Sequence, residues 1–203
     1  MRKKLGIILI GLGTALIISA LLLFLYNQNE DKHAGEMVNQ VLPQIQATIE
    51  EHSFHDVSEE DEYTEVDIEP VTTKIAMVNG YNYIGVLSIP TLSIELPVLS
   101  ECDEVLLKIA PCRDYGDVTT DNLVIAAHNY KNHFGRLGQL TSGNEVTFTE
   151  MDGTIHSYKV SQSMVVSPND VELVINSGFE LALYTCDYMN QNRIAVYCKE
   201  IVE

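Results

Sequence analysis

An uncharged run of 22 residues, from Leu5 to Tyr26, constrains this chain more than any other feature. As an α-helix it would reach roughly 33 Å, enough to cross the roughly 30 Å hydrocarbon core of a bilayer. Basic residues precede the run and an acidic stretch follows it, which predicts a cytoplasmic N-terminus and an extracellular remainder. The alternative is a cleaved signal peptide, but its apolar region is usually shorter and ends in small residues, whereas this run ends in large ones.

The composition argues against several classes of function. The chain of 203 residues has 12 Lys and Arg against 29 Asp and Glu, for a formal net charge of −17, and it has no basic cluster beyond residues 2–4. A partner nucleic acid is therefore not expected, because phosphate binding requires a basic surface. Four cysteines without C-x-x-C spacing do not indicate a disulfide scaffold or a structural zinc site.

Charge divides the remaining chain unevenly. Residues 50–69 contain ten acidic residues and no Lys or Arg, whereas residues 70–203 carry 16 acidic and 8 basic side chains. Between Ala34 and Glu50 apolar residues recur at helical spacing, and Pro43 should kink such a helix. We therefore predict three parts: a cytoplasmic tip and transmembrane anchor at 1–26, a juxtamembrane helix and acidic linker at 27–69, and a folded domain at 70–203.

Residues 27–69 are expected to form a solvated spacer that the folded domain does not need. An acidic block repels itself and buries too little apolar area to offset the entropy of ordering the chain. Two alternatives stay open. The segment could be a partner-binding or calcium-binding tail. Otherwise Tyr63, Val66 and Ile68, which alternate with acidic residues, could form an edge strand or lid on the domain.

Short apolar runs broken by turn residues predict an all-β domain. Strands are expected at 83–90, 93–100, 122–127, 145–149, 154–166, 181–185 and 194–201, with one or two helical turns at 103–109. Seven or eight strands with only short helices between them favour a closed or nearly closed antiparallel β-barrel, or a sandwich. The N-terminal transmembrane helix would precede this barrel.

Three residues lie where apolar strands meet polar loops, a common place for functional sites. Cys186 ends a strand, His128 follows another, and Arg193 begins the strand after Cys186. If those last strands form a hairpin, Arg193 lies beside Cys186. A permanent positive charge there lowers a thiol pKa and can bind a developing oxyanion. The structural alternatives are an inert buried thiol, a core histidine and a surface arginine.

The other cysteines have plainer explanations. Cys198 lies inside the last strand, in phase with its apolar residues, and is expected to be a small buried hydrophobic side chain. Cys102 and Cys112 flank the short helical segment, where a disulfide between them is possible. His133 and His156 lie in a loop and in a strand, with less to indicate a catalytic role.

Taken together, these segments resemble the sortase family, the membrane-anchored cysteine transpeptidases of Gram-positive bacteria. Leu183 to Cys186 matches the last four places of the family's Thr-Leu-x-Thr-Cys motif, with Ala182 where the first threonine is usual. Ile125 to Asn129 is similar to the histidine segment, Tyr83 to Pro90 to the first strand, and Phe134 to Leu137 to the segment after the histidine. The resemblance spans about residues 81–203.

The resemblance implies a barrel of about eight strands and a substrate with a C-terminal sorting signal similar to Leu-Pro-x-Thr-Gly. Cys186 would be the nucleophile and form a thioester, His128 would transfer protons, and Arg193 would bind the substrate backbone and the oxyanion. Thr185 would contribute its hydroxyl or amide to substrate binding. An amine of a cell-wall precursor or of a pilin would resolve the thioester, without a cofactor or a catalytic metal.

Subclass, calcium and rival functions stay open at this level. Some relatives hold a structural calcium, and five carboxylates could supply oxygen ligands, although solvated surface groups are the preferred interpretation. These are Glu101, Asp103, Glu104, Asp114 and Asp117. The rival functions are another extracellular cysteine peptidase, which would not need Arg193, and a non-catalytic β-domain tethered to the membrane.

Overall fold

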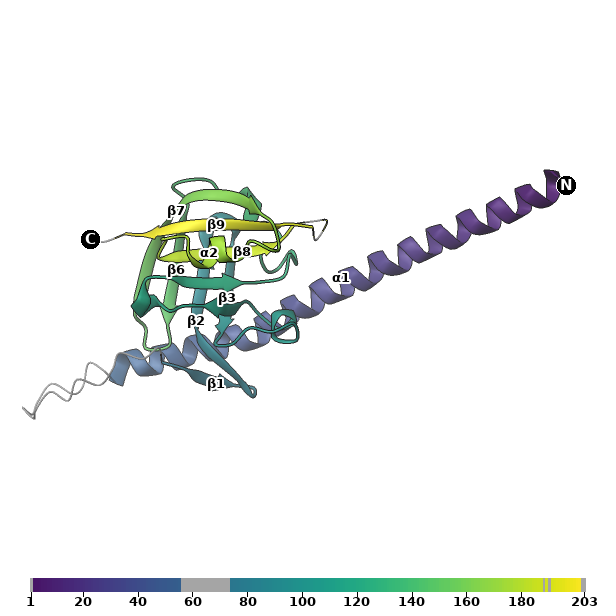
Figure 1. Cartoon of the computed structure of the whole chain (residues 1–203). Coiled ribbons are helices and arrows are strands. Elements are labelled where there is room, and N and C mark those ends of the chain that lie inside the picture. The colour runs from purple at the N-terminus through teal and green to yellow at the C-terminus, as the bar shows by residue number, and fades with distance from the viewer. Residues whose placement is uncertain (1, 56–73, 188, 190, 202–203) are drawn as a thin grey trace, which may run out of the picture.

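The computed structural model describes residues 2–55, 74–187, 189 and 191–201, and places one long helix against a β-barrel (Figure 1). The helix, α1, runs from Arg2 to His55. The strands are β1 (Ala76–Val78), β2 (Tyr81–Ile89), β3 (Ile94–Leu99), β4 (Cys112–Tyr115), β5 (Leu123–Ala126), β6 (Glu145–Glu150), β7 (Ile155–Val166), β8 (Leu181–Cys186) and β9 (Arg193–Glu200). One helical turn, α2 (Glu172–Ile175), and four short 3₁₀ turns lie in the connections.

Eight of the strands form a closed ring, as the sequence predicted. The order is β2-β3-β4-β5-β8-β9-β7-β6, and β6 pairs again with β2, while β1 extends only the start of β2. Gly85 makes the closure possible, because its φ is +156° and a Cβ there would lie 2.1 Å from the carbonyl oxygen of Thr149 on β6. The strands β1 and β4, three and four residues long, were not predicted.

The expectation of a wholly antiparallel barrel is wrong at two places. The pairs β3–β4 and β5–β8 are parallel, because long connections carry the chain back across the barrel before each second strand. The β6–β7 hairpin lies within the second connection. Parallel pairing matters for function, since the C-terminal ends of β5 and β8 then meet at the same edge of the barrel.

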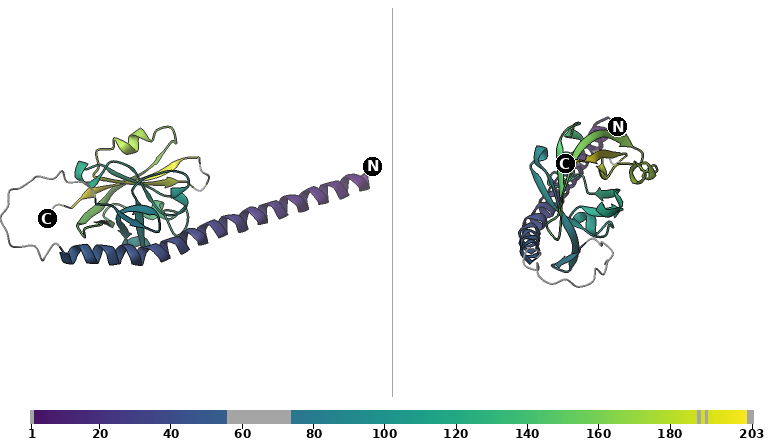
Figure 2. Two further views of the ribbon diagram at one scale, coloured as in Figure 1. Left: turned by 90° about the horizontal axis from the view of Figure 1, so that it is seen from below. Right: turned by 90° about the vertical axis from the view of Figure 1, so that its left-hand side faces the viewer.

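Helix α1 packs its C-terminal half along the barrel, and its N-terminal half extends away from it (Figure 2). Ala34, Val38, Val41 and Ile45, spaced by three and four residues, are all buried. Val41 and Ile45 share one apolar cluster with residues of β2, β3 and β4. Strand β2 is thus covered on both faces, which explains why Tyr83–Leu87 is buried without polar alternation.

This contact differs from the solvated spacer expected for the first part of 27–69. The helix is assigned without interruption through Pro43, whose side chain is exposed. At its end, the ring Nδ1 of His52 lies 3.1 Å from the carbonyl oxygen of Met151 in the β6–β7 turn. The acidic residues 56–69, including the proposed edge strand or lid, lie outside the described residues.

The apolar run at the start of α1 has the properties of a membrane span. The helix is long and apolar enough to cross a bilayer, and its most apolar window has no buried residues. Large apolar side chains from Ile7 to Tyr26 are exposed to solvent. These exposed side chains are suited to contact lipid.

Candidate active site

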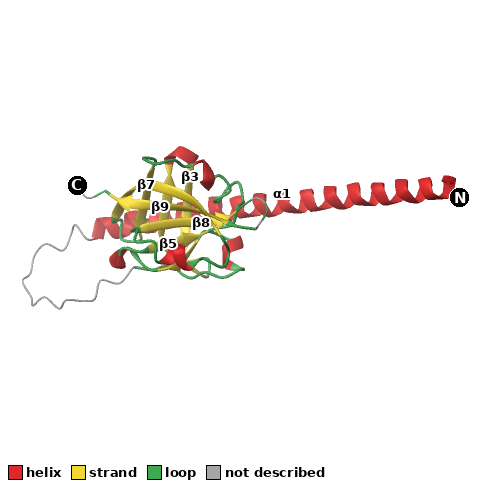
Figure 3. Cartoon of the chain, turned by 45° about the horizontal axis from the view of Figure 1, so that its top comes forward, coloured by secondary structure: helices red, strands yellow, loops and turns green. Residues whose placement is uncertain are grey.

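The β8–β9 hairpin places Cys186 directly opposite Arg193. The two strands are antiparallel and in continuous register, and Cys186 and Arg193 form their last Cα pair at this edge. Both side chains are half-buried. The hairpin predicted from the spacing is therefore present as β8 and β9 (Figure 3). The thiol and the guanidinium group come from facing positions of these strands.

The parallel pairing of β5 with β8 brings the segments that carry His128 and Cys186 to the same edge of the barrel. Ala126 is the Cα partner of Tyr184 in the last pair of these strands, and His128 and Cys186 each follow that pair by two residues. Two hydrogen bonds join the same two segments, one just before and one just after His128 and Cys186. The Thr185 hydroxyl donates to the carbonyl oxygen of Ala127 over 2.8 Å. The Asn129 amide donates to the carbonyl oxygen of Asp187 over 3.0 Å.

These two hydrogen bonds lie on either side of His128 and Cys186. Ala127 and Thr185 directly precede the two candidate residues, and Asn129 and Asp187 directly follow them. Thr185 is 2% exposed, and its hydroxyl proton is committed to the protein. The observed bond gives Thr185 a role in joining the two strand ends. A contact of Thr185 with substrate stays a prediction.

His128 lies in a partly buried environment that keeps its imidazole neutral near pH 7. Burial lowers the pKa of His128 below its ordinary value, and Lys108 adds to this, while Glu30 and Glu104 oppose it. The ring Nε2 is buried and has no hydrogen-bond partner among the described residues. The Tyr130 ring packs against the imidazole with centroids 4.8 Å apart.

Asp187 makes several hydrogen bonds with the described residues between β8 and β9. Its carboxylate accepts hydrogen bonds from the backbone N–H groups of Met189 and Gln191 and from the Asn192 amide. From the sequence alone, this loop was predicted only to be polar. The contacts show that Asp187 fixes the turn that returns the chain from Cys186 to Arg193.

The other three cysteines differ from Cys186 in their surroundings. Cys198 is fully buried, and burial raises its pKa to about 12. A hydrogen bond with Cys102 and burial raise the pKa of Cys112. Both Cys102 and Cys112 are free thiols in this structure. At neutral pH, Cys112 and Cys198 are thiols and not thiolates.

A second histidine near the site has a structural explanation. His133 is fully buried beside Tyr130, with ring centroids 5.6 Å apart. Burial lowers its pKa to about 4, so the ring is uncharged at neutral pH. It belongs to the core beneath the loop that follows His128.

The carboxylates considered for calcium binding mostly have other partners. Asp103 accepts two backbone hydrogen bonds, from Val105 and Leu106. Asp114 accepts from the Tyr184 hydroxyl over 2.8 Å, and Asp117 pairs with Arg113 over 2.9 Å. Within the described parts of the chain no group of three metal-ligating side chains occurs. The described residues therefore offer no calcium site built from these carboxylates.

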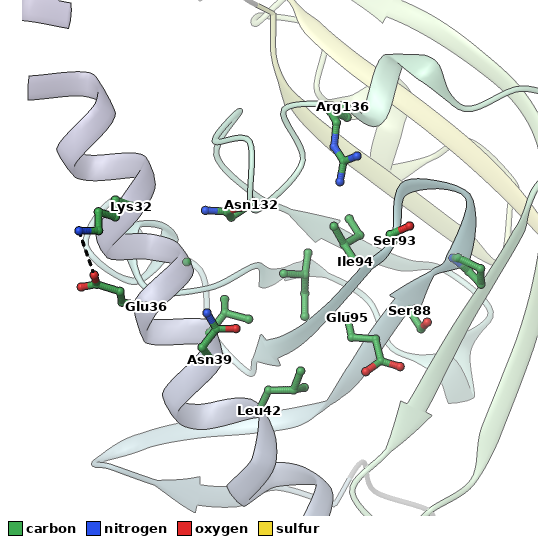
Figure 4. Close-up of a pocket in the computed structure, with 14 residues that line it drawn as sticks. Lys32, Glu36, Asn39, Leu42, Ser88, Ser93, Ile94, Glu95, Asn132 and Arg136 are labelled. Carbon is green, nitrogen blue, oxygen red and sulfur yellow. Dashed lines mark ion pairs between the residues drawn. The ribbon is translucent and has the colours of Figure 1, made fainter. Parts of the chain in front are cut away.

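A groove of about 860 Å³ lies between α1, the β2–β3 hairpin and the loop after His128 (Figure 4). Asn39, Glu95 and Arg136 are among the side chains that line it, and Arg136 also donates to the carbonyl oxygen of Leu92. Cys186, His128 and Arg193 do not line it. Asn132, in the loop after His128, also lines the groove.

The fold and the site together define a class: a closed β-barrel behind an apolar N-terminal helix, with a thiol, an imidazole and a guanidinium at one edge. A sequence profile described as the sortase domain matches residues 87–201, more than half of the chain. The chain therefore belongs to the sortase family, whose members are transpeptidases. Comparison with curated protein sequences finds no match.

Solved sortase structures share the fold. Sortase C from Streptococcus pneumoniae is 23% identical, with 83% of this chain and 97% of that chain covered and a TM-score of 0.55. Sortase D5 from Clostridium perfringens is 17% identical, with 82% and 99% covered and a TM-score of 0.58. Sortase A from Corynebacterium diphtheriae is 18% identical, with 88% and 94% covered and a TM-score of 0.53.

Proposed function

We propose that this sortase uses Cys186 to cleave a C-terminal sorting signal of the Leu-Pro-x-Thr-Gly type in surface proteins, and then joins the released carbonyl to an amine. The observation that carries the proposal is the arrangement of β5, β8 and β9: Cys186 is opposite Arg193, and the parallel strand β5 leads to His128 at the same edge of the barrel. The acceptor would be an amine of the cell wall or of a pilin. The pilin alternative has support from a relative, because the S. pneumoniae sortase C structure is described as giving insight into pilin substrate specificity.

The chemistry follows from the ordinary properties of the three groups. The neutral imidazole of His128 takes the proton of the Cys186 thiol, and the thiolate attacks the carbonyl carbon of the Thr–Gly bond. Arg193 stabilises the oxyanion. The C–N bond breaks as His128 returns the proton to the leaving amine, and a thioester remains. An incoming amine attacks the thioester, gives its proton to His128, and displaces the thiolate, which His128 reprotonates.

The anchor would set where this reaction takes place. We infer that Leu5 to Tyr26 spans the cell membrane, with the N-terminus in the cytoplasm and the barrel outside. The loop after His128 contacts Glu30 and Asp31 of α1, a few residues beyond the apolar run. The reaction edge would then lie close to the outer surface of the membrane.

The test is peptide cleavage by the full-length protein in detergent or nanodiscs. Peptides across a library of sorting motifs should be cut, and a thioester adduct on Cys186 should be detected by mass spectrometry. A small amine should divert the product from acid to amide. Cys186→Ala should abolish both adduct and turnover, whereas the matched variant Cys102→Ala should retain them.

Two results would overturn the proposal. Turnover in Cys186→Ala would exclude Cys186 as the nucleophile. Formation of acid alone, even with a high amine concentration, would indicate a peptidase and not a transpeptidase.

A further inference from the structure

Helix α1 contacts the loop that follows His128. The helix residues in this contact are Glu30 and Asp31, a few residues beyond the apolar run. The Tyr130 hydroxyl donates to Oε2 of Glu30 over 3.4 Å. The backbone N–H of Asn132 donates to Oδ1 of Asp31, and the Asn132 amide donates to the carbonyl oxygen of Asp31, each over 3.3 Å. Figure 4 shows Asn132 between the helix and the barrel. About 100 residues of chain separate these partners, so only the tertiary fold joins them.

The helix approaches the loop closely at Gly35. A Cβ at that position would lie 2.5 Å from the Asn132 amide nitrogen. Ala34 and Val38, on either side, are buried, and Val38 belongs to the main apolar cluster of the barrel. The contact is therefore part of a packed interface and not an isolated surface hydrogen bond.

Tyr130, which contacts Glu30 through its hydroxyl, also contacts His128 through its ring. The Tyr130 ring lies against the imidazole, tilted by 42° with centroids 4.8 Å apart. The imidazole Nε2 receives no hydrogen bond within the described structure. Packing against Tyr130 therefore helps to restrain the orientation of the ring.

We propose that Glu30 and Tyr130 are positioning residues for His128, so that the first helical turn outside the apolar run forms part of the catalytic apparatus. Glu30 holds the Tyr130 hydroxyl, and the Tyr130 ring holds the imidazole in the orientation needed for proton transfer beside Cys186. The inference rests on the proposed function, because it assigns His128 the proton-transfer step. It gives the anchor helix a role in the reaction as well as in tethering.

Glu30 also acts on His128 through its charge. The charged or titratable groups that influence or adjoin the imidazole include Glu30 from α1, Lys108 and Glu104 from the β3–β4 connection, and Tyr130 and His133 from its own loop. The Cys186 thiol ends β8, the strand that pairs with β5. Glu30 and Glu104 raise the pKa of His128, whereas burial and Lys108 lower it. Removing the Glu30 charge should therefore lower the pKa of His128 further. Removing the Tyr130 hydroxyl leaves that charge in place.

The experiment compares Tyr130→Phe, Glu30→Gln, Glu30→Asp and the double variant Tyr130→Phe/Glu30→Gln in the full-length protein in nanodiscs. Each single variant should lower kcat/KM for a cleaved peptide about three- to tenfold, because the hydrogen bond is lost in Tyr130→Phe and weakened in the Glu30 variants, which loosens His128. The double variant should lose little more than the larger single loss, since both changes act on one contact. Glu30→Asp keeps the charge and shortens the reach, so it should behave like Tyr130→Phe.

A pH profile separates positioning from a merely structural role. The acidic limb of kcat/KM should move to lower pH in Glu30→Gln and stay in place in Tyr130→Phe. The control is Glu36→Gln, an exposed glutamate on the same helix that pairs with Lys32 over 3.7 Å. It should change neither the rate nor the profile. Melting temperatures verify that every variant is folded.

The alkylation rate of Cys186 offers a readout that needs no substrate. If His128 assists loss of the thiol proton, alkylation should slow in Tyr130→Phe by a factor similar to that in kcat/KM. Wild-type rates in Tyr130→Phe and Glu30→Gln, or losses that multiply in the double variant, would overturn the inference and leave the proposed function intact. Absence of peptide cleavage by the wild-type protein would instead overturn the proposed function and the inference with it.

Discussion

Cys186 differs from the buried thiols of the chain in its accessibility. It is half-buried at the end of β8, whereas Cys112 and Cys198 are fully buried. Burial raises the pKa of Cys198, and a hydrogen bond with Cys102 together with burial raises the pKa of Cys112. We expect iodoacetamide to alkylate Cys186 in the folded protein at least about tenfold faster than Cys198, because the thiolate is the reactive form. Peptide mapping after timed labelling measures both rates. Equal rates would favour the non-catalytic alternative.

Arg193 should not be replaceable by lysine. Its planar guanidinium can hold two acceptors at once, whereas lysine is a point charge on a flexible stem. Arg193→Lys should therefore lower kcat/KM by about tenfold or more, with an unchanged melting temperature. Arg113→Lys, whose ion pair with Asp117 lies in the β4–β5 region, is the control. Full activity in Arg193→Lys would mean that charge alone suffices.

His156 provides a pH-dependent contribution to stability. Its Nε2 lies 2.9 Å from Glu150 and its Nδ1 lies 3.1 Å from Glu200. Burial opposes the charged form, but the hydrogen bonds to both carboxylates outweigh it and raise the pKa of His156 above its ordinary 6.5. A raised folded-state pKa stabilises the fold fully below the unfolded value, and this stabilisation is lost as pH rises through the folded value.

The corresponding measurement is the melting temperature between about pH 5.5 and pH 9. The difference between wild type and His156→Gln should be largest at the acidic end and should shrink as the pH rises. His33→Gln, an exposed histidine on α1, is the control and should show no such trend. A difference that grows with pH would contradict the assignment.

At the scale of elements, the packing of α1 on the barrel predicts a stability effect far from the active site. Ile45 has no exposed surface and lies in a cluster with Tyr83, Val86 and Leu99. Ile45→Ala should lower the free energy of unfolding by about 2–4 kcal/mol, because it leaves a cavity. Urea unfolding of the solubilised full-length chain measures this change.

Gln40→Ala is the matched control, since Gln40 is exposed on the same helix. It should change the free energy of unfolding by less than about 0.5 kcal/mol. Equal stability of Ile45→Ala and Gln40→Ala would restore the view of residues 27–69 as a passive spacer. The same packing leads us to expect that a chain beginning at Pro70 melts at a lower temperature than one beginning at Asn27.

At the scale of the whole molecule, the orientation across the membrane can be tested directly. The basic residues before Leu5 predict that residues 27–203 lie outside the cell. Protease added to intact protoplasts should digest the barrel, whereas a cytoplasmic marker protein should survive. Protection of the barrel until the membrane is permeabilised would overturn the orientation and the cell-surface function with it.

Local patterns allowed much of this molecule to be predicted. The anchor depends on an uninterrupted apolar run, and the main strands depend on short apolar segments between turn residues. The hairpin that sets Cys186 opposite Arg193 depends on two strands joined by a short loop. The family resemblance added the assignment of His128, because its position after an apolar strand was by itself more typical of a structural histidine.

The sequence by itself determined the elements that depend on neighbouring residues: the apolar anchor, the strand content and the hairpin of Cys186 and Arg193. The tertiary structure alone decided the contacts between distant segments. The Thr185–Ala127 bond beside the candidate site joins residues 58 apart, and the Glu30–Tyr130 contact joins residues 100 apart. Neither has a local pattern, because each depends on the parallel pairing of β5 with β8 or on the packing of α1. The burial of Val41 and Ile45 against the barrel could not be predicted either. The apolar spacing of a helix shows that one face is buried but does not identify the surface that covers it.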